Sequence, residues 1–136
     1  PADPAQSRAS SWAWNQSVTA GQGQGVPVEA VTGPKAGAST WVCGYVDMVD
    51  GPGSQALAYD YLNALLDPSA GKYILEAWGY GHANAKSFAI ADKAAVTRFG
   101  YDDLERFMTN SLFQAGIGVA LQQKLADRFE TIKSGF

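Results

Sequence analysis

The chain has 136 residues, a net charge of −3, an apolar fraction of 46% and a charged fraction of 17%. This length and composition are typical of one folded globular domain, and no apolar run approaches the length of a membrane-spanning helix. The chain has only 10 Lys and Arg residues, and they are scattered, which argues against a nucleic-acid partner because such partners require clustered basic side chains.

The first part of the chain predicts short strands separated by loops. Residues 11–14 are short, apolar and aromatic, which indicates a strand ending at Trp14, and residues 16–25 predict a short helix that runs into a Gly-rich turn. Apolar and polar residues alternate over 26–32, so we expect a second strand there. The apolar run over 40–49 predicts a third strand, and segments rich in Gly and Pro bound these strands.

The rest of the chain predicts helices. One helix has its apolar face within residues 57–66, and Asp67 with Pro68 predicts the cap and first residue of the next, which ends at Gly79. Short helical pieces are expected over 80–99, and another short helix begins at Asp102. A final helix carries an apolar stripe that we expect to face the core. The stripe consists of Ile117, Leu121, Leu125, Phe129 and Ile132.

This alternation of strands and helices predicts an α/β domain. Two or three strands are too few for a complete doubly wound sheet, so we expect the sheet to be completed by chain outside this sequence. The N-terminus looks like the middle of a protein and lacks the pattern of a signal peptide, which suggests a fragment or a processed chain. An unpaired sheet edge invites association, so we also expect a dimer or a larger species.

Aromatic residues occur where loops are expected to meet strands and helices. Trp14, Trp41 and Tyr80 occupy such positions. A flat ring at the mouth of a site can stack on an apolar ligand or hold a cation over its face, which contributes roughly 0.5–2 kcal/mol. For any one of these residues, burial in the core is the more ordinary role.

The order of several short motifs along the chain favours ligand binding. In this order they resemble the spermidine/putrescine-binding proteins of ABC importers, over nearly the whole chain. That family carries a W-N-G-S-like element, a P-K-E-G loop, W-x-D, a G-Y turn with a nearby Asn, and a W-Q pair before the last helix. The matching motifs here are Trp14-Asn15-Gln16-Ser17, Val26-Pro27-Val28, Pro34-Lys35-Ala36-Gly37, Trp41-Val42-Cys43, Trp78-Gly79-Tyr80 with Asn84, Phe113-Gln114 and Ile132-Lys133-Ser134-Gly135.

The resemblance implies a fold and a role. The family has two α/β lobes that close on a ligand, and residues 1–136 would form the C-terminal portion of such a type II periplasmic-binding-protein fold, without its N-terminal half. The implied function is extracytoplasmic, periplasmic capture of a small, amine-containing solute for an ABC importer. The implied partners are this ligand, the membrane subunits of the importer, and the missing half or a second copy. The resemblance implies neither enzymatic activity nor a cofactor.

The resemblance also implies site residues. Trp14, Trp41 and Tyr80 match aromatic residues that line the ligand cleft of the family, and Gln114 matches a glutamine that bonds a ligand amine. Cys43 stands where the family has an aspartate that pairs with an ammonium group, and a thiol is a poor counter-ion. Either the ligand is less cationic, or carboxylates on the missing half meet its charge.

Other functions find weaker support in the sequence. Cys43 and His82 suggest a thiol nucleophile with its base, but a buried apolar cysteine and a histidine in a turn are the more ordinary roles. One Cys and one His provide no metal-site spacing. The glycines of residues 21–25 lack the Lys-Ser/Thr ending of a phosphate loop. The alternative function is a structural or interaction module, derived from a binding-protein lobe that has lost its ligand.

Overall fold

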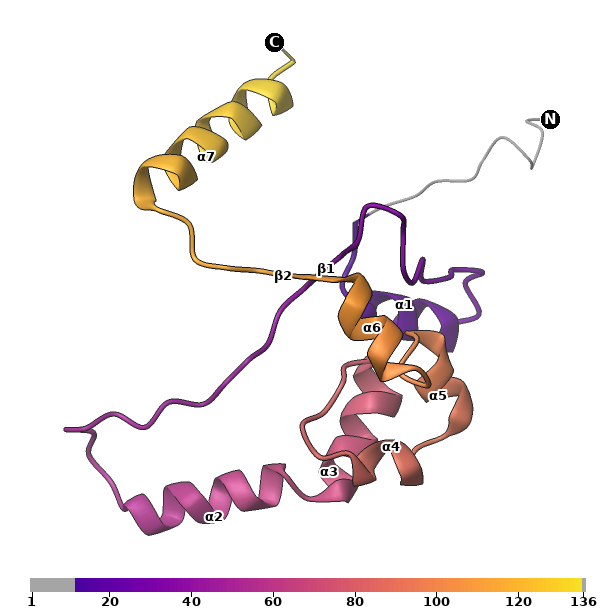
Figure 1. Ribbon diagram of the computed structural model, residues 1–136, viewed down its shortest axis with the longest axis vertical. Helices are drawn as coiled ribbons and strands as arrows, with labels where there is room; N and C mark the ends of the chain where they lie inside the picture. The colour runs from indigo at the N-terminus through magenta and orange to yellow at the C-terminus, as the bar shows by residue number, and fades with distance from the viewer. Residues whose placement is uncertain (1–11, 136) are drawn as a thin grey trace.

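The computed structural model describes residues 12–135 as a cluster of short helices with one small sheet at its edge and two further helices that lie apart (Figure 1). No helix in this part of the chain is long and apolar enough to cross a membrane. In chain order the elements are α1 (Asn15–Gly23), β1 (Ala38–Thr40), α2 (Gln55–Leu65), α3 (Pro68–Tyr73), the π-helix η2 (Ile74–Trp78), α4 (Lys86–Ile90), α5 (Lys93–Arg98), α6 (Leu104–Asn110), β2 (Ser111–Phe113) and α7 (Val119–Lys133).

A small core lies inside the cluster of helices formed by α1, α3, η2 and α4 to α6 (Figure 1). Leu75 is fully buried, and Phe99 and Tyr101 pack beside it. The Tyr101 ring meets the rings of Phe88 and Phe107 edge-on, with centroids 5.9 and 5.1 Å apart. These contacts hold the α5–α6 connection against η2. Phe99 and Tyr101 of this connection also line the cavity described below.

Several helix boundaries follow from local capping chemistry. The Asp67 carboxylate accepts a hydrogen bond from the Ser69 backbone N–H at 2.8 Å, and Pro68 occupies the first helical position of α3. Gly79 ends η2 in the left-handed region with φ 72°. These predicted boundaries are confirmed, and α6 is capped by Asp103, one residue after the predicted start.

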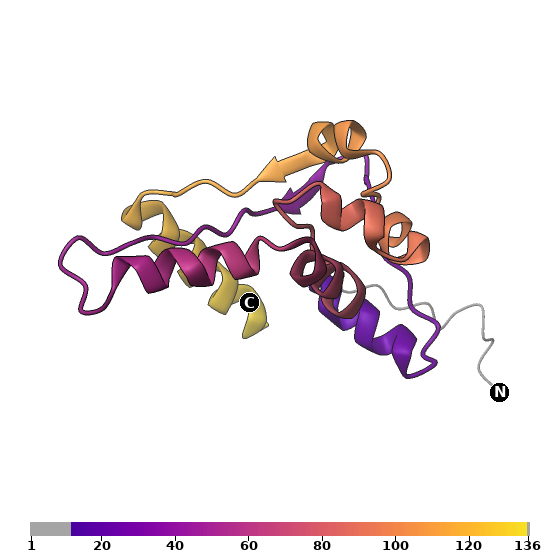
Figure 2. The same cartoon turned by 90° about the horizontal axis from the view of Figure 1, so that it is seen from below.

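The sheet consists of two parallel strands from distant parts of the chain (Figure 2). Its register pairs Ala38 with Ser111, residue 39 with residue 112, and Thr40 with Phe113. The Thr40 hydroxyl donates to Ser111 Oγ at 3.1 Å, and the Gln114 backbone N–H extends the pairing to Thr40 O at 2.8 Å. Helices combined with a small parallel sheet agree with the α/β class in its broad sense.

The strands predicted before residue 33 are wrong. Ser11 lies outside the described residues, and Ala13 and Trp14 lead directly into α1 without strand pairing. The segment 26–32 contains no strand, because Pro27 has no N–H to donate and the Val28 N–H bonds to Val26 O at 2.8 Å in a tight turn.

The strand predicted over 40–49 is wrong for all but its first residue. β1 begins at Ala38 and ends at Thr40, and within residues 12–135 no other strand pairs with the segment 41–49. Both faces of this segment are apolar, as in a strand buried on two sides, yet Val49 is 99% exposed. A strand requires a neighbour to satisfy its backbone, and among the described residues no other strand forms backbone hydrogen bonds with this segment. β2 was not predicted, because three residues give no measurable periodicity.

The final helix is confirmed, but its predicted place against the core is wrong. α7 follows the extended segment 114–118 and projects away from the helical cluster, as does α2 (Figure 1). Ile117 of the predicted stripe lies before the helix, and the four stripe residues within α7 are between 49% and 62% exposed.

Candidate functional site

Three aromatic residues from separate parts of the chain meet in one cluster. The rings of Trp14 and Trp41 stand edge-to-face with centroids 4.5 Å apart, and the rings of Trp41 and Tyr80 do so at 5.8 Å. The motif order led us to expect this gathering on one surface. Their role as ligand contacts stays a prediction.

Each ring is placed by the end of a secondary-structure element. Trp14 occupies the N-cap position of α1, and Trp41 follows the last residue of β1. Tyr80 follows Gly79, whose φ of 72° turns the chain sharply after η2. A side chain at Gly79 would collide with the Phe99 ring, so only glycine allows η2 to end so close to the core.

A cavity of about 1060 Å³ opens beside the aromatic cluster, and all three rings line it. This volume is sufficient for a small organic solute. The charged side chains on its wall come from Asp102, Asp103 and Arg106, which together carry one net negative charge. Asp103 Oδ1 accepts from the Arg106 backbone N–H at 3.0 Å, so it also caps α6.

Cys43 lies on the wall of this cavity and is exposed. The ordinary alternative, a cysteine buried on a strand, is therefore wrong. Because the segment after Thr40 is not a strand, strand alternation does not place Cys43 on the same face as Trp41. The role of Cys43 beside an ammonium group stays a prediction.

His82 stabilises the turn before α4. Its Nε2 lies 2.9 Å from Leu65 O, which can only accept, so Nε2 carries the proton. Nδ1 then accepts from the Asn84 backbone N–H at 3.2 Å and lies 3.0 Å from Ser87 Oγ. With both ring nitrogens engaged, His82 is not available as the base for Cys43. Ser87 is fully buried, so it is not an accessible nucleophile either.

Gln114 lies next to the cavity but is not among its lining residues. Its Nε2 donates to Ser39 Oγ at 3.1 Å, and Ser39 does line the cavity. The structure therefore places Ser39, and not Gln114, on the wall of the cavity. Nothing in the sequence singled out Ser39, because its position depends on the pairing of β1 with β2.

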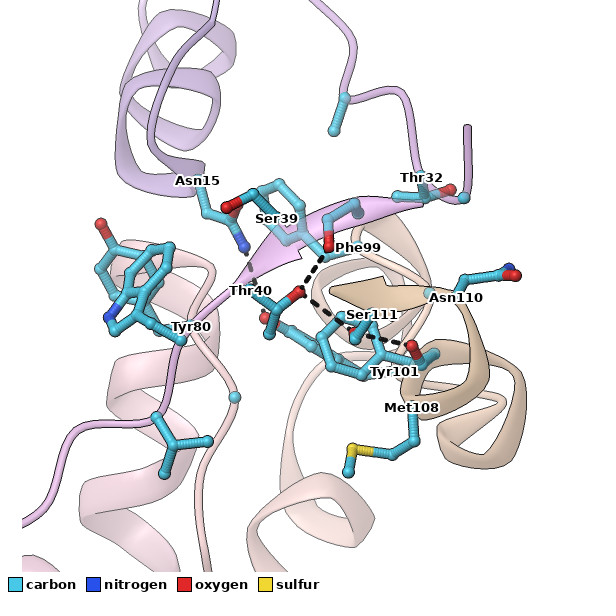
Figure 3. A pocket seen from close by; sticks show the side chains of 18 of the residues that line it. Asn15, Thr32, Ser39, Thr40, Tyr80, Phe99, Tyr101, Met108, Asn110 and Ser111 are labelled. Atoms are coloured by element: carbon cyan, nitrogen blue, oxygen red, sulfur yellow. Dashed lines mark hydrogen bonds between the residues drawn. The ribbon is translucent and has the colours of Figure 1, made fainter. Parts of the chain in front are cut away.

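A hydrogen-bonded group that includes Asn15 and Tyr101, both on the cavity wall, was also missed (Figure 3). Asn15 Nδ2 donates to Gly79 O at 2.8 Å and lies 3.3 Å from the Tyr101 hydroxyl, which itself donates to Gly79 O at 3.2 Å. Burial raises the pKa of Tyr101, so the phenol stays protonated. Asn15 follows Trp14 in the W-N motif, and this adjacency was the signal that could have pointed to it.

Two further observations bound the chemistry of the site. Across residues 12–135, no group of three or more His, Cys, Asp or Glu side chains is placed to hold a metal ion. Comparison of the chain with protein-family models, with curated proteins and with solved structures finds no match in any of the three. The cavity and its aromatic wall are therefore the features from which a function can be inferred.

Proposed function

We propose that the protein captures a small, amine-containing solute in the cavity beside Trp14, Trp41 and Tyr80, as the extracytoplasmic binding component of an ABC importer. The observation that carries the proposal is the meeting of these rings, which come from three distant segments, on the wall of one cavity of about 1060 Å³. The resemblance of the motif order to the spermidine/putrescine-binding family supports the same ligand class.

The chemistry of the wall suits an alkyl amine. Aromatic faces contact methylene groups and attract an ammonium group, with roughly 0.5–2 kcal/mol from each well-placed ring. The Asp102 carboxylate adds negative charge and accepts no hydrogen bond from any residue in the described part of the chain. The site holds its ligand by contacts alone and contains no nucleophile with an adjacent base, so we propose binding without chemical conversion.

The open side of the molecule fits a two-lobe arrangement. The segment 41–49 and helix α2 present apolar side chains to solvent, including Val42, Val46 and Leu57. In the proposed binding-protein fold, a second lobe covers such surfaces and closes over the ligand. Closure excludes water and strengthens every polar contact in the cavity.

Calorimetric titration tests the proposal. The purified protein is titrated with putrescine and with spermidine, and 1,4-butanediol serves as the uncharged control of similar length. We expect heat of binding from both amines and a rise in the melting temperature, because a ligand that binds only the native state stabilises it by mass action. Binding of neither amine, or equal binding of the diol, contradicts the proposal.

A second candidate function is an interaction module, and the exposed area favours it. The apolar stripe of α7 is about half exposed or more, on a helix that projects away from the helical cluster, and an exposed apolar surface of this kind is typical of an interaction site. The partner we propose for this case is a second copy of the chain, joined through the apolar stripe of α7. In this case we expect light scattering to give twice the monomer mass for the wild type and a mass closer to that of the monomer for Phe129→Ser. A monomer at high concentration contradicts this candidate.

A further inference from the structure

We infer that Asn15 Oδ1 is the hydrogen-bond acceptor with which the cavity distinguishes ligands that carry N–H groups from fully alkylated cations. The inference rests on the proposed function, because it assigns a role at the same site. It concerns a residue for which the family resemblance implies no role of its own. Asn15 lines the cavity directly beside Trp14, at the first position of α1.

The orientation of the Asn15 amide is fixed by its neighbour. The backbone oxygen of Gly79 can only accept a hydrogen bond, so the atom that faces it at 2.8 Å must be Nδ2 and not Oδ1. Nδ2 also lies near the Tyr101 hydroxyl on the same side. Oδ1 is therefore turned away from both groups, and no donor in the part of the chain that the structure describes bonds to it.

The groups that hold this amide are buried. Tyr101 is 7% exposed, and Gly79 is buried at the end of η2. The Tyr101 hydroxyl donates to the same Gly79 oxygen, so the amide, the phenol and the carbonyl form one connected group. An acceptor held in this way loses little rotational freedom when a ligand binds, which favours affinity and selectivity.

The position of Oδ1 predicts which ligands it favours. The adjacent rings attract any organic cation, whether or not the cation carries hydrogen. A carbonyl oxygen forms a hydrogen bond only with a cation that has an N–H to donate. A hydrogen bond from a charged donor is stronger than one between neutral groups. The rings therefore supply general affinity for cations, and Asn15 supplies the preference for primary or secondary ammonium groups.

The test compares two dications in calorimetry. Putrescine carries N–H groups, whereas its bis(trimethylammonium) analogue has the same chain and charge without them. We expect the wild-type protein to prefer putrescine by about tenfold or more, the change in affinity that one charge-assisted hydrogen bond supplies. In Asn15→Leu, which keeps the bulk of the side chain but removes the acceptor, we expect the preference to fall below about threefold, through weaker putrescine binding.

Matched variants control for folding and bulk. Asn84 makes a similar side-chain bond to Leu66 O at 2.8 Å but does not line the cavity, so Asn84→Ala should keep the wild-type preference. If Asn15→Leu does not fold, the preference for putrescine is measured on Asn15→Ala in its place. A preference that survives in the folded Asn15 variant, or a wild type that binds both dications equally, overturns the role of Asn15 alone. If neither dication binds the wild type, the proposed function is overturned with it.

Discussion

The ring of Trp41 stands almost perpendicular to the ring of Trp14, at an interplanar angle of 84° and a centroid separation of 4.5 Å. This edge-to-face contact joins the end of β1 to the start of α1 and forms one wall of the cavity. Such contacts are worth about 0.5–1.5 kcal/mol beyond the area they bury. The same contact therefore stabilises the fold and leaves the face of a ring available to a ligand.

Replacing Cys43 by aspartate should strengthen the binding of putrescine and spermidine. Cys43 lines the cavity and is exposed, so a carboxylate there meets an ammonium group without the cost of burial. We expect about tenfold tighter binding, equivalent to about 1.4 kcal/mol, in calorimetry. The variant Cys43→Asn has the shape of the aspartate variant without its charge, so it should not show this gain. Equal affinities for the aspartate variant and the wild type would mean that the ammonium group is held elsewhere.

Replacing Tyr101 by phenylalanine should lower stability by about 1 kcal/mol at pH 8, because the hydrogen bond to Gly79 O is lost. Burial raises the pKa of Tyr101 above the ordinary tyrosine value of about 10. The stability linked to its proton is thus present below that pH and is lost as the pH rises above it. Urea unfolding at pH 8 and near pH 10.5 should show the difference between wild type and variant shrinking.

Exposed Tyr59 supplies the control for this pH series. Tyr59→Phe should differ little from the wild type at either pH, because its hydroxyl makes no hydrogen bond among the described residues. If the difference between wild type and Tyr101→Phe stayed constant from pH 8 to pH 10.5, the Tyr101 phenol would not be buried as the structure has it.

Replacing Gly71 by alanine should destabilise the protein. Gly71 is buried in α3, and a methyl group there would collide with Ser87 Oγ and His82 Nδ1. Overpacking of this kind costs about 1–3 kcal/mol, measurable as a lower melting temperature. Gly116→Ala is the matched control, because nothing lies within 4 Å of a Cβ at that position, and its effect should stay within about 0.5 kcal/mol. A neutral Gly71→Ala would show that α3 and α4 are less closely packed.

The sequence was informative where local chemistry decides the structure. Asp67, Pro68 and Gly79 determine helix ends through groups one to four residues away, and those boundaries are visible in the sequence. The strand predictions were wrong because a strand depends on a distant partner segment, which its own residues do not specify. The segment 41–49 has the composition of a buried strand and lies exposed.

The candidate site shows the same division. The motif order brought attention to Trp14, Trp41 and Tyr80 because aromatic residues at element ends stand out in a sequence. The Asn15 amide and the Gly79 carbonyl that fixes it are 64 positions apart, and no local pattern joins them. Ser39 likewise gains its place only from the pairing of β1 with β2.

The most direct test of the aromatic cavity is the affinity for putrescine of Trp41→Ala, measured by calorimetry beside the wild type and Tyr59→Ala. Trp41 contacts both Trp14 and Tyr80, so removing the Trp41 ring leaves a gap in the middle of the aromatic wall of the cavity. We expect at least about tenfold weaker binding for Trp41→Ala, as the loss of one desolvated cation–π contact predicts. Tyr59→Ala removes an exposed ring outside the cavity and should bind as the wild type does. Unchanged affinity in a folded Trp41→Ala would contradict ligand capture at this cavity.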